Sequence, residues 1–165
     1  MRVIGLAILH FLLLAPTAHA KSFGDYAGAI YIRNYDGDTI TFNLPGLHPI
    51  IGEKISIRIN GIDTPEIDGK CEKENYDAIQ AKEMVADILK DAEQIVLRNM
   101  KRGKYFRIAA DVIVDGEDLR ELLVDAGMAV QYGGGKKTHK WCRYGKCFVK
   151  YLSKNYKISV RGVRC

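Results

Sequence analysis

After its first twenty residues, the chain lacks an apolar run long enough to cross a bilayer, which takes about 20 consecutive residues. It also lacks an internal repeat and a low-complexity linker, which argues against a repeat architecture and against loosely joined modules. We therefore expect a soluble protein without membrane association. Residues 21–165 are long enough for one packed core and are predicted to form a single domain.

The first twenty residues have the features of a secretory signal peptide. A basic start at Arg2 precedes an apolar stretch over residues 5–16, and the segment closes with Ala18-His19-Ala20. The stretch is too short and wrongly flanked for a membrane span. We predict a cleaved signal peptide over residues 1–20 and a secreted or periplasmic protein. The alternative is a buried N-terminal helix.

Acidic residues are outnumbered by basic ones. The chain has 25 lysines and arginines against 20 aspartates and glutamates, a formal net charge of +5, and removal of Arg2 with the signal leaves 24 against 20, or +4. This balance favours a polyanionic partner, since phosphate neutralisation supplies most sequence-independent affinity for nucleic acid. The alternative is that the lysine-rich segments 101–104, 136–137 and 146–157 are ordinary solvated surface.

Cysteine is scarce, but all four cysteines lie after the predicted signal peptide: Cys71, Cys142, Cys147 and Cys165. An even number in an oxidising compartment predicts two disulfides, for which three pairings are possible. We favour Cys71 with Cys142 and Cys147 with Cys165, because the second bridge would hold the C-terminus. A zinc site formed by His139 with Cys71, Cys142 and Cys147 is the alternative.

The hydrophobic periodicity predicts a mainly β, α+β fold. Alternating apolar residues predict an antiparallel meander over residues 29–33, 39–44 and 55–59, and two later strands over 94–98 and 107–114. Apolar residues at helical spacing predict helices over 74–92 and 117–126, with Gly127 as a left-handed cap and a third helix over 148–156. Five strands with a helix after the third is the order of an OB-fold Greek-key barrel, here with about three helices.

Two acidic clusters and two arginines are the candidate functional residues. The clusters are Asp36-Gly37-Asp38-Thr39 and Asp63-Thr64-Pro65-Glu66, and the arginines are Arg58 and Arg107. Carboxylates suit a hard cation and a general base, and arginines suit a phosphoryl transition state, so the set predicts a metal-dependent nuclease. Turn formation by Asp36-Gly37 and helix capping by Asp63 are the structural alternatives.

These residues, in this order, resemble the staphylococcal-nuclease-like (thermonuclease) family. The similarity runs from about Tyr26 to Ala129 and rests on four strings. They are the first acidic cluster, residues 57–66 with Arg58 five positions before Asp-Thr-Pro-Glu, the segment Lys104-Tyr105-Phe106-Arg107, and the Leu-Val-x-x-Gly-x-Ala pattern over 122–129.

The resemblance implies a site and a reaction. One Ca²⁺ would be held by Asp38, Asp63 and the Thr64 carbonyl, with Asp36 supporting these ligands without touching the ion. Glu66 would position or deprotonate the attacking water, and Arg58 and Arg107 would bind the phosphate. Lys104, Tyr105 and Tyr132 would contact the substrate. The implied reaction is sequence-nonspecific hydrolysis of single- and double-stranded DNA and of RNA to 3′-phosphate products, by a monomer.

Two other function classes remain open at this stage. Some domains of this family keep the barrel without the catalytic residues and bind nucleic acid or peptides, and this chain departs from the family by having Phe106 where a glycine is common. An exported structural or inhibitory protein would explain the cysteines but not the charged clusters. The presence of Asp38, Arg58, Asp63, Glu66 and Arg107 favours the enzyme.

Overall fold

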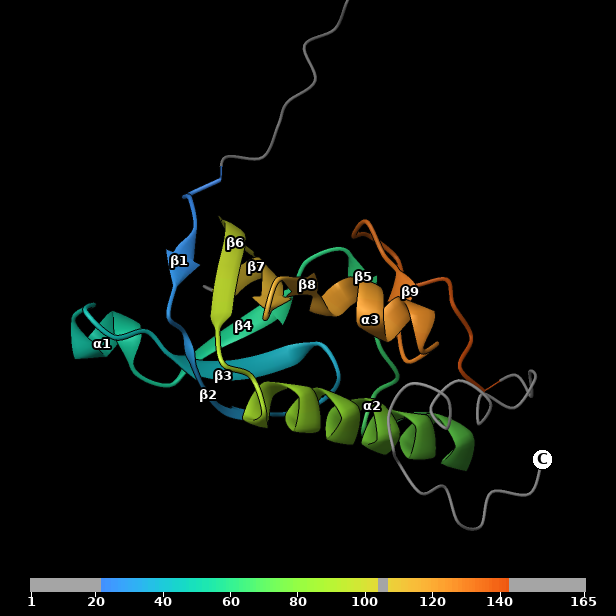
Figure 1. Cartoon of the computed structure of the whole chain (residues 1–165). Helices are drawn as coiled ribbons and strands as arrows, with labels where there is room; N and C mark the ends of the chain where they lie inside the picture. The colour runs from blue at the N-terminus through green and yellow to red at the C-terminus, as the bar shows by residue number, and fades with distance from the viewer. Residues whose placement is uncertain (1–21, 104–106, 143–165) are drawn as a thin grey trace, which may run out of the picture.

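The computed structural model describes residues 22–103 and 107–142. The predicted signal peptide, Lys104, Tyr105, the predicted Cys147–Cys165 bridge and the predicted helix over 148–156 lie outside these ranges. The elements, in chain order, are β1 (Tyr26–Ala27), β2 (Ile30–Asn34), β3 (Thr39–Asn43), α1 (Pro49–Gly52), β4 (Ile55–Ile59), β5 (Ile62–Asp63), α2 (Glu72–Lys90), β6 (Ile95–Arg102), β7 (Ile108–Val114), β8 (Glu117–Asp118), α3 (Leu119–Asp125) and β9 (Val130–Gln131) (Figure 1).

The main sheet curls into a barrel-like shape. Its strands follow the order β1-β6-β7-β4-β3-β2, and the β4–β7 pair is parallel while its neighbours are antiparallel. β1 and β2 are the two halves of one bent strand, separated by Gly28 with a φ of 82°. Because the first half pairs with β6 and the second with β3, this strand joins both ends of the sheet. The predicted OB-fold, mainly β with helices, is confirmed.

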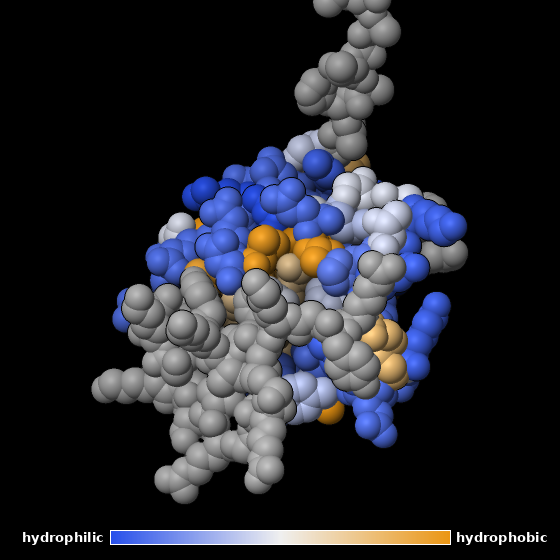
Figure 2. All heavy atoms as spheres, turned by 90° about the vertical axis from the view of Figure 1, so that its right-hand side faces the viewer, coloured by the Kyte–Doolittle hydropathy of each residue, from blue (hydrophilic) through white to orange (hydrophobic). Residues whose placement is uncertain are grey.

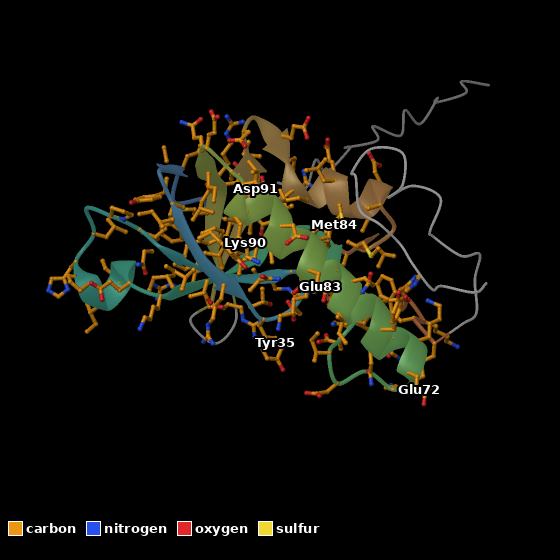
Figure 3. The ribbon with its side chains drawn as sticks, turned by 60° about the horizontal axis from the view of Figure 1, so that its bottom comes forward. Tyr35, Glu72, Glu83, Met84, Lys90 and Asp91 are labelled. Carbon is orange, nitrogen blue, oxygen red and sulfur yellow. A yellow bond between two sulfur atoms is a disulfide. The ribbon has the colours of Figure 1, made fainter. Side chains whose placement is uncertain are left out.

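Helix α2 packs along the sheet and covers its core (Figures 1 and 3). Its predicted apolar stripe is largely buried: Ala78, Ala81 and Val85 are fully enclosed, Leu89 nearly so, and Ile88 is partly buried against the same core. Opposite them lie the inward-facing residues of the barrel strands, Ile40, Phe42, Ile57, Ile59, Leu97 and Val112. Within the part of the chain that is described, no helix has both the length and the apolar character needed to cross a membrane.

Several predicted boundaries were wrong by a few residues. Helix α2 spans Glu72–Lys90 rather than 74–92, because its N-cap is Cys71 and two acids stabilise its first turn. Helix α3 begins at Leu119 rather than at residue 117, because the Asp118 side chain accepts a hydrogen bond from Arg120 N and caps the helix there. β6 runs on to Arg102 across a register shift near Asn99, whose φ is 50°. Gly127 is left-handed, as predicted.

A small second sheet determines what lies beside the acidic clusters. β5 pairs with β9, with Asp63 opposite Val130, and Tyr132 N donates to Gly61 O. The pairing is antiparallel, so the chain after residue 131 runs alongside the chain before residue 62. Neither strand was predicted, since each has only two residues.

The Cys71–Cys142 disulfide joins the chain after β5 to the chain after β9. It confirms the first of the two predicted bridges. It also makes the zinc alternative wrong, because two of the four proposed ligands are joined to each other rather than available as thiolates.

Candidate active site

Three residues predicted from the acidic clusters and the arginine meet at one rim of the barrel. Asp38 directly precedes β3, Arg58 lies on β4 opposite Thr39, and Asp63 ends β5. Arg58 Nη1 lies 2.6 Å from Asp38 Oδ1, and Arg58 Nη2 lies 3.6 Å from Asp63 Oδ1. Both aspartates are buried, and one guanidinium therefore contacts two carboxylates from different segments of the chain.

The turn before β3 explains the positions of Asp36 and Gly37. The Oδ1 of Asp36 accepts hydrogen bonds from Asp38 N at 3.0 Å and from Thr39 N at 2.7 Å, so the turn interpretation of this residue is confirmed. Gly37 is required for space, because a Cβ there would lie 2.9 Å from Ala81 Cβ and from Thr64 Cγ2. The absence of a side chain lets this turn seat against both α2 and the second acidic cluster.

Asp38 is a strongly perturbed carboxyl group. Burial and the neighbouring charge of Asp36 raise its pKa to about 7, with a smaller rise from Asp63, although Arg58 and Thr39 lower it. Burial and the charge of Asp36 together outweigh the opposing effect of Arg58 on this pKa.

The raised pKa of Asp38 leads to a prediction about how the free energy of unfolding depends on pH. The folded protein keeps a proton on Asp38 that the unfolded chain releases near its ordinary pKa of 3.8. Without divalent ions, the free energy of unfolding should therefore fall as the pH rises from about 4 to about 7, relative to an Asp38→Asn variant. Thermal unfolding of both proteins in chelator, followed across this range by circular dichroism, measures the difference. Parallel pH profiles would contradict it.

Lys137 is the main residue of this site that the sequence analysis missed, since it was assigned to solvated surface. Its Nζ lies 2.7 Å from Asp63 Oδ1 and also forms an ion pair with Glu66 Oε1. Burial lowers the pKa of Lys137, but the contacts with Asp63 and Glu66 outweigh it and the net shift is upward. The ammonium therefore stays charged between the two acids. One sequence signal could have indicated Lys137. Like Glu66, it lies five residues before one of the two cysteines that form the disulfide.

An open pocket of about 550 Å³ faces this cluster. Its lining is polar and aromatic: Tyr35, Asp36, Thr39, Ser56, Arg58, Glu66, Arg107, Tyr132 and Lys137. Arg107 is exposed just before β7, where its carbonyl accepts a hydrogen bond from Gly103 N. Tyr35, which was not predicted, projects from the turn after β2 (Figure 3). The structure thus brings Arg58, Glu66, Arg107 and Tyr132 to one pocket, as predicted.

The rim fits a hard divalent cation. If all four acids are ionised, Asp36, Asp38, Asp63 and Glu66 exceed the paired cations Arg58 and Lys137 by two charges. Asp63 Oδ1 is buried and has no well-angled hydrogen bond among the described residues, although both cations are near it. A buried carboxylate oxygen with spare acceptor capacity is what calcium binding uses. With two aspartates and one carbonyl, waters would complete the shell.

The surface around this region is mostly hydrophilic. Figure 2 shows the face beyond the N-terminal end of α2, where hydrophilic residues predominate around a small apolar area.

Comparison with known proteins identifies the family. No curated protein matches the chain. The family model described as Staphylococcal nuclease homologue matches residues 56–148, a range that contains Arg58, Asp63, Glu66, Arg107 and Lys137. The match covers more than half of the chain, and the fold agrees with it. The chain therefore belongs to the staphylococcal nuclease homologue family.

Proposed function

We propose that the protein is a calcium-dependent, sequence-nonspecific nuclease that hydrolyses phosphodiester bonds of DNA and RNA and leaves 3′-phosphate ends. The observation that carries the proposal is Arg58, which contacts the buried Asp38 and Asp63 and lines the same pocket as Glu66 and Arg107. A structural or binding domain has no need of two arginines and a solvent-accessible carboxylate in one pocket, with two buried carboxylates against one of the arginines.

Each side chain of the pocket has a chemical role in this proposal. Asp38, Asp63 and the Thr64 carbonyl hold calcium, which supplies a Lewis acid for a phosphate oxygen when it is bound. Glu66, whose side chain is half exposed, accepts a proton from the attacking water. Arg58 and Arg107 donate hydrogen bonds to the phosphate oxygens, on which negative charge accumulates.

The bond changes follow from this arrangement. The water oxygen forms a bond to phosphorus while the bond from phosphorus to the 5′ oxygen breaks. The phosphate stays on the 3′ side, the departing 5′ oxygen takes up a proton from solvent to become a hydroxyl group, and Glu66 returns its proton to solvent. Because the pocket presents charged and polar groups to the phosphate, little base preference is expected. Tyr132 and Tyr35 are placed to contact the flanking nucleotides.

Digestion of single-stranded DNA and of RNA by the oxidised protein over residues 21–165 tests the proposal. We expect cleavage with calcium and none with a chelator. The product ends should block polymerase extension until a phosphatase removes the 3′-phosphate. If the protein binds DNA and no divalent ion supports cleavage, it is a binding module. Cleavage that continues undiminished in the chelator would contradict the metal requirement.

The proposal includes the location of the protein. The signal-like residues 1–20 and the Cys71–Cys142 bridge both suit a secreted or periplasmic enzyme, since disulfides persist in oxidising compartments. We propose that it acts as a monomer.

A further inference from the structure

Lys137 lies between two acids that the proposed reaction uses for different purposes. Its ammonium contacts Asp63, which is proposed to bind calcium, and Glu66, which is proposed to accept the proton of water. Its side chain is 42% exposed, so it has room to move toward solvent. A flexible cation in this position can compete with a metal ion.

The backbone holds Lys137 at this place through a closed ring. Glu66 and Lys137 each stand five residues before the joined cysteines, Cys71 and Cys142. The disulfide closes one end of the ring, and the Lys137–Glu66 ion pair closes the other. The antiparallel β5–β9 pairing holds the two chains together upstream of Glu66 and of Lys137. A covalent link and a strand pairing on either side make this contact more defined than an ordinary surface ion pair.

We propose that Lys137 is an internal cation that neutralises Asp63 and Glu66 in the calcium-free protein, and that calcium must displace it from Asp63. The inference rests on the proposed function, because it takes Asp63 as a calcium ligand. Calcium binding affects the two contacts of Lys137 differently. Asp63 Oδ1 is buried and must exchange Lys137 for calcium, whereas Glu66 is half exposed and can keep its ion pair with Lys137.

Lys137 should weaken calcium binding for two reasons. Before calcium binds, the lysine stabilises the free carboxylates, and this stabilisation is lost on binding. After calcium binds, a nearby ammonium repels the ion. Both effects weaken binding, so removal of the charge at residue 137 should strengthen it.

Calcium titration of a Lys137→Met variant by isothermal calorimetry tests the proposal. We expect the dissociation constant to fall about threefold to tenfold, in line with an ion pair that is partly exposed to solvent. Lys136→Met is the matched control, because Lys136 is exposed, has no ion pair in the described ranges and removes the same net charge. Lys137→Arg should restore an affinity near that of the original protein.

The outcomes separate this inference from the proposed function. If the original protein binds calcium and cleaves DNA, but the Lys137→Met and Lys136→Met variants bind calcium equally well, the inference is wrong and the nuclease proposal stands. If the original protein neither binds calcium nor cleaves DNA, the proposed function fails and the inference with it.

A second measurement needs no variant. Calcium should increase the rate at which an amine-modifying reagent labels Lys137 in the original protein, while the labelling of Lys136 stays unchanged, as followed by mass spectrometry. If calcium leaves the labelling rate of Lys137 unaltered, the proposed displacement of Lys137 from Asp63 is wrong.

Discussion

Replacement of Glu66 with glutamine is expected to lower the rate of DNA cleavage by about 10² to 10⁴, because general-base catalysis typically contributes that much. The amide cannot take the proton of water, but it has the same shape and can still accept a hydrogen bond from Lys137. The fold and calcium binding should therefore persist, since Glu66 is not among the proposed calcium ligands. Single-turnover cleavage with saturating calcium measures the chemical step directly.

The pH profile distinguishes a base from a residue that only holds Lys137. If Glu66 is the base, the pH profile of the Glu66→Gln enzyme at saturating calcium should differ from that of the original enzyme. Asp68→Asn is the control, since Asp68 is exposed on the same loop and lies outside the pocket. A Glu66→Gln enzyme with near-normal turnover, or one that keeps the original pH profile, would exclude Glu66 as the base.

The fold was predictable because its signals are local. The isoleucines of β4, and Ile40 and Phe42 of β3, alternate with polar residues because only one face of each strand is buried in the barrel. The apolar stripe of α2 recurs at helical spacing because only one face of the helix packs on the core. The closure through β1 and β2 was not predictable in the same way. It depends on a two-residue strand and a bend at Gly28, and neither has a periodic pattern.

Part of the site was predictable for a different reason. Asp38 and Arg58 meet because the β3–β4 register places Thr39 opposite Arg58, and a meander makes that register short-ranged in sequence. The pairing of Lys137 with Glu66 spans 71 residues and depends on the β5–β9 contact and the disulfide. The sequence allowed three cysteine pairings, so it could not determine which lysine reaches the acids.

The role of Gly37 goes beyond the turn that its motif predicted. The Asp36-Gly37 pair did predict the turn between β2 and β3, which Tyr35 N closes by donating to Thr39 O. However, the glycine is not among the left-handed residues, and its importance comes from contact with Thr64 and Ala81. Such a close approach between distant segments has no local sequence signal.

Replacement of Arg58 with lysine is expected to lower the rate by about 10² or more, the usual cost of losing one aligned donor to a developing oxyanion. The charge is kept, but a single ammonium cannot replace a planar group that reaches Asp38 at 2.6 Å and Asp63 at 3.6 Å. The variant therefore loses the bidentate contact with phosphate and the bridge between the two aspartates. We expect the loss mainly in kcat, with a smaller change in KM, because the phosphate charge grows in the transition state.

Arg120→Lys is a closely matched control for this substitution. Arg120 also joins two aspartates, with Nη2 at 2.6 Å from Asp118 and Nη1 at 3.7 Å from Asp111, and its side chain is 32% exposed against 23% for Arg58. It lies outside the pocket that Arg58 lines, so its replacement reports what the loss of such a bridge costs in stability alone. If both variants lose similar stability but only Arg58→Lys loses kcat, the guanidinium of Arg58 acts on the phosphate. If Arg58→Lys cleaves DNA normally, Arg58 is a structural bridge, and Arg107 would be the arginine that the phosphate meets.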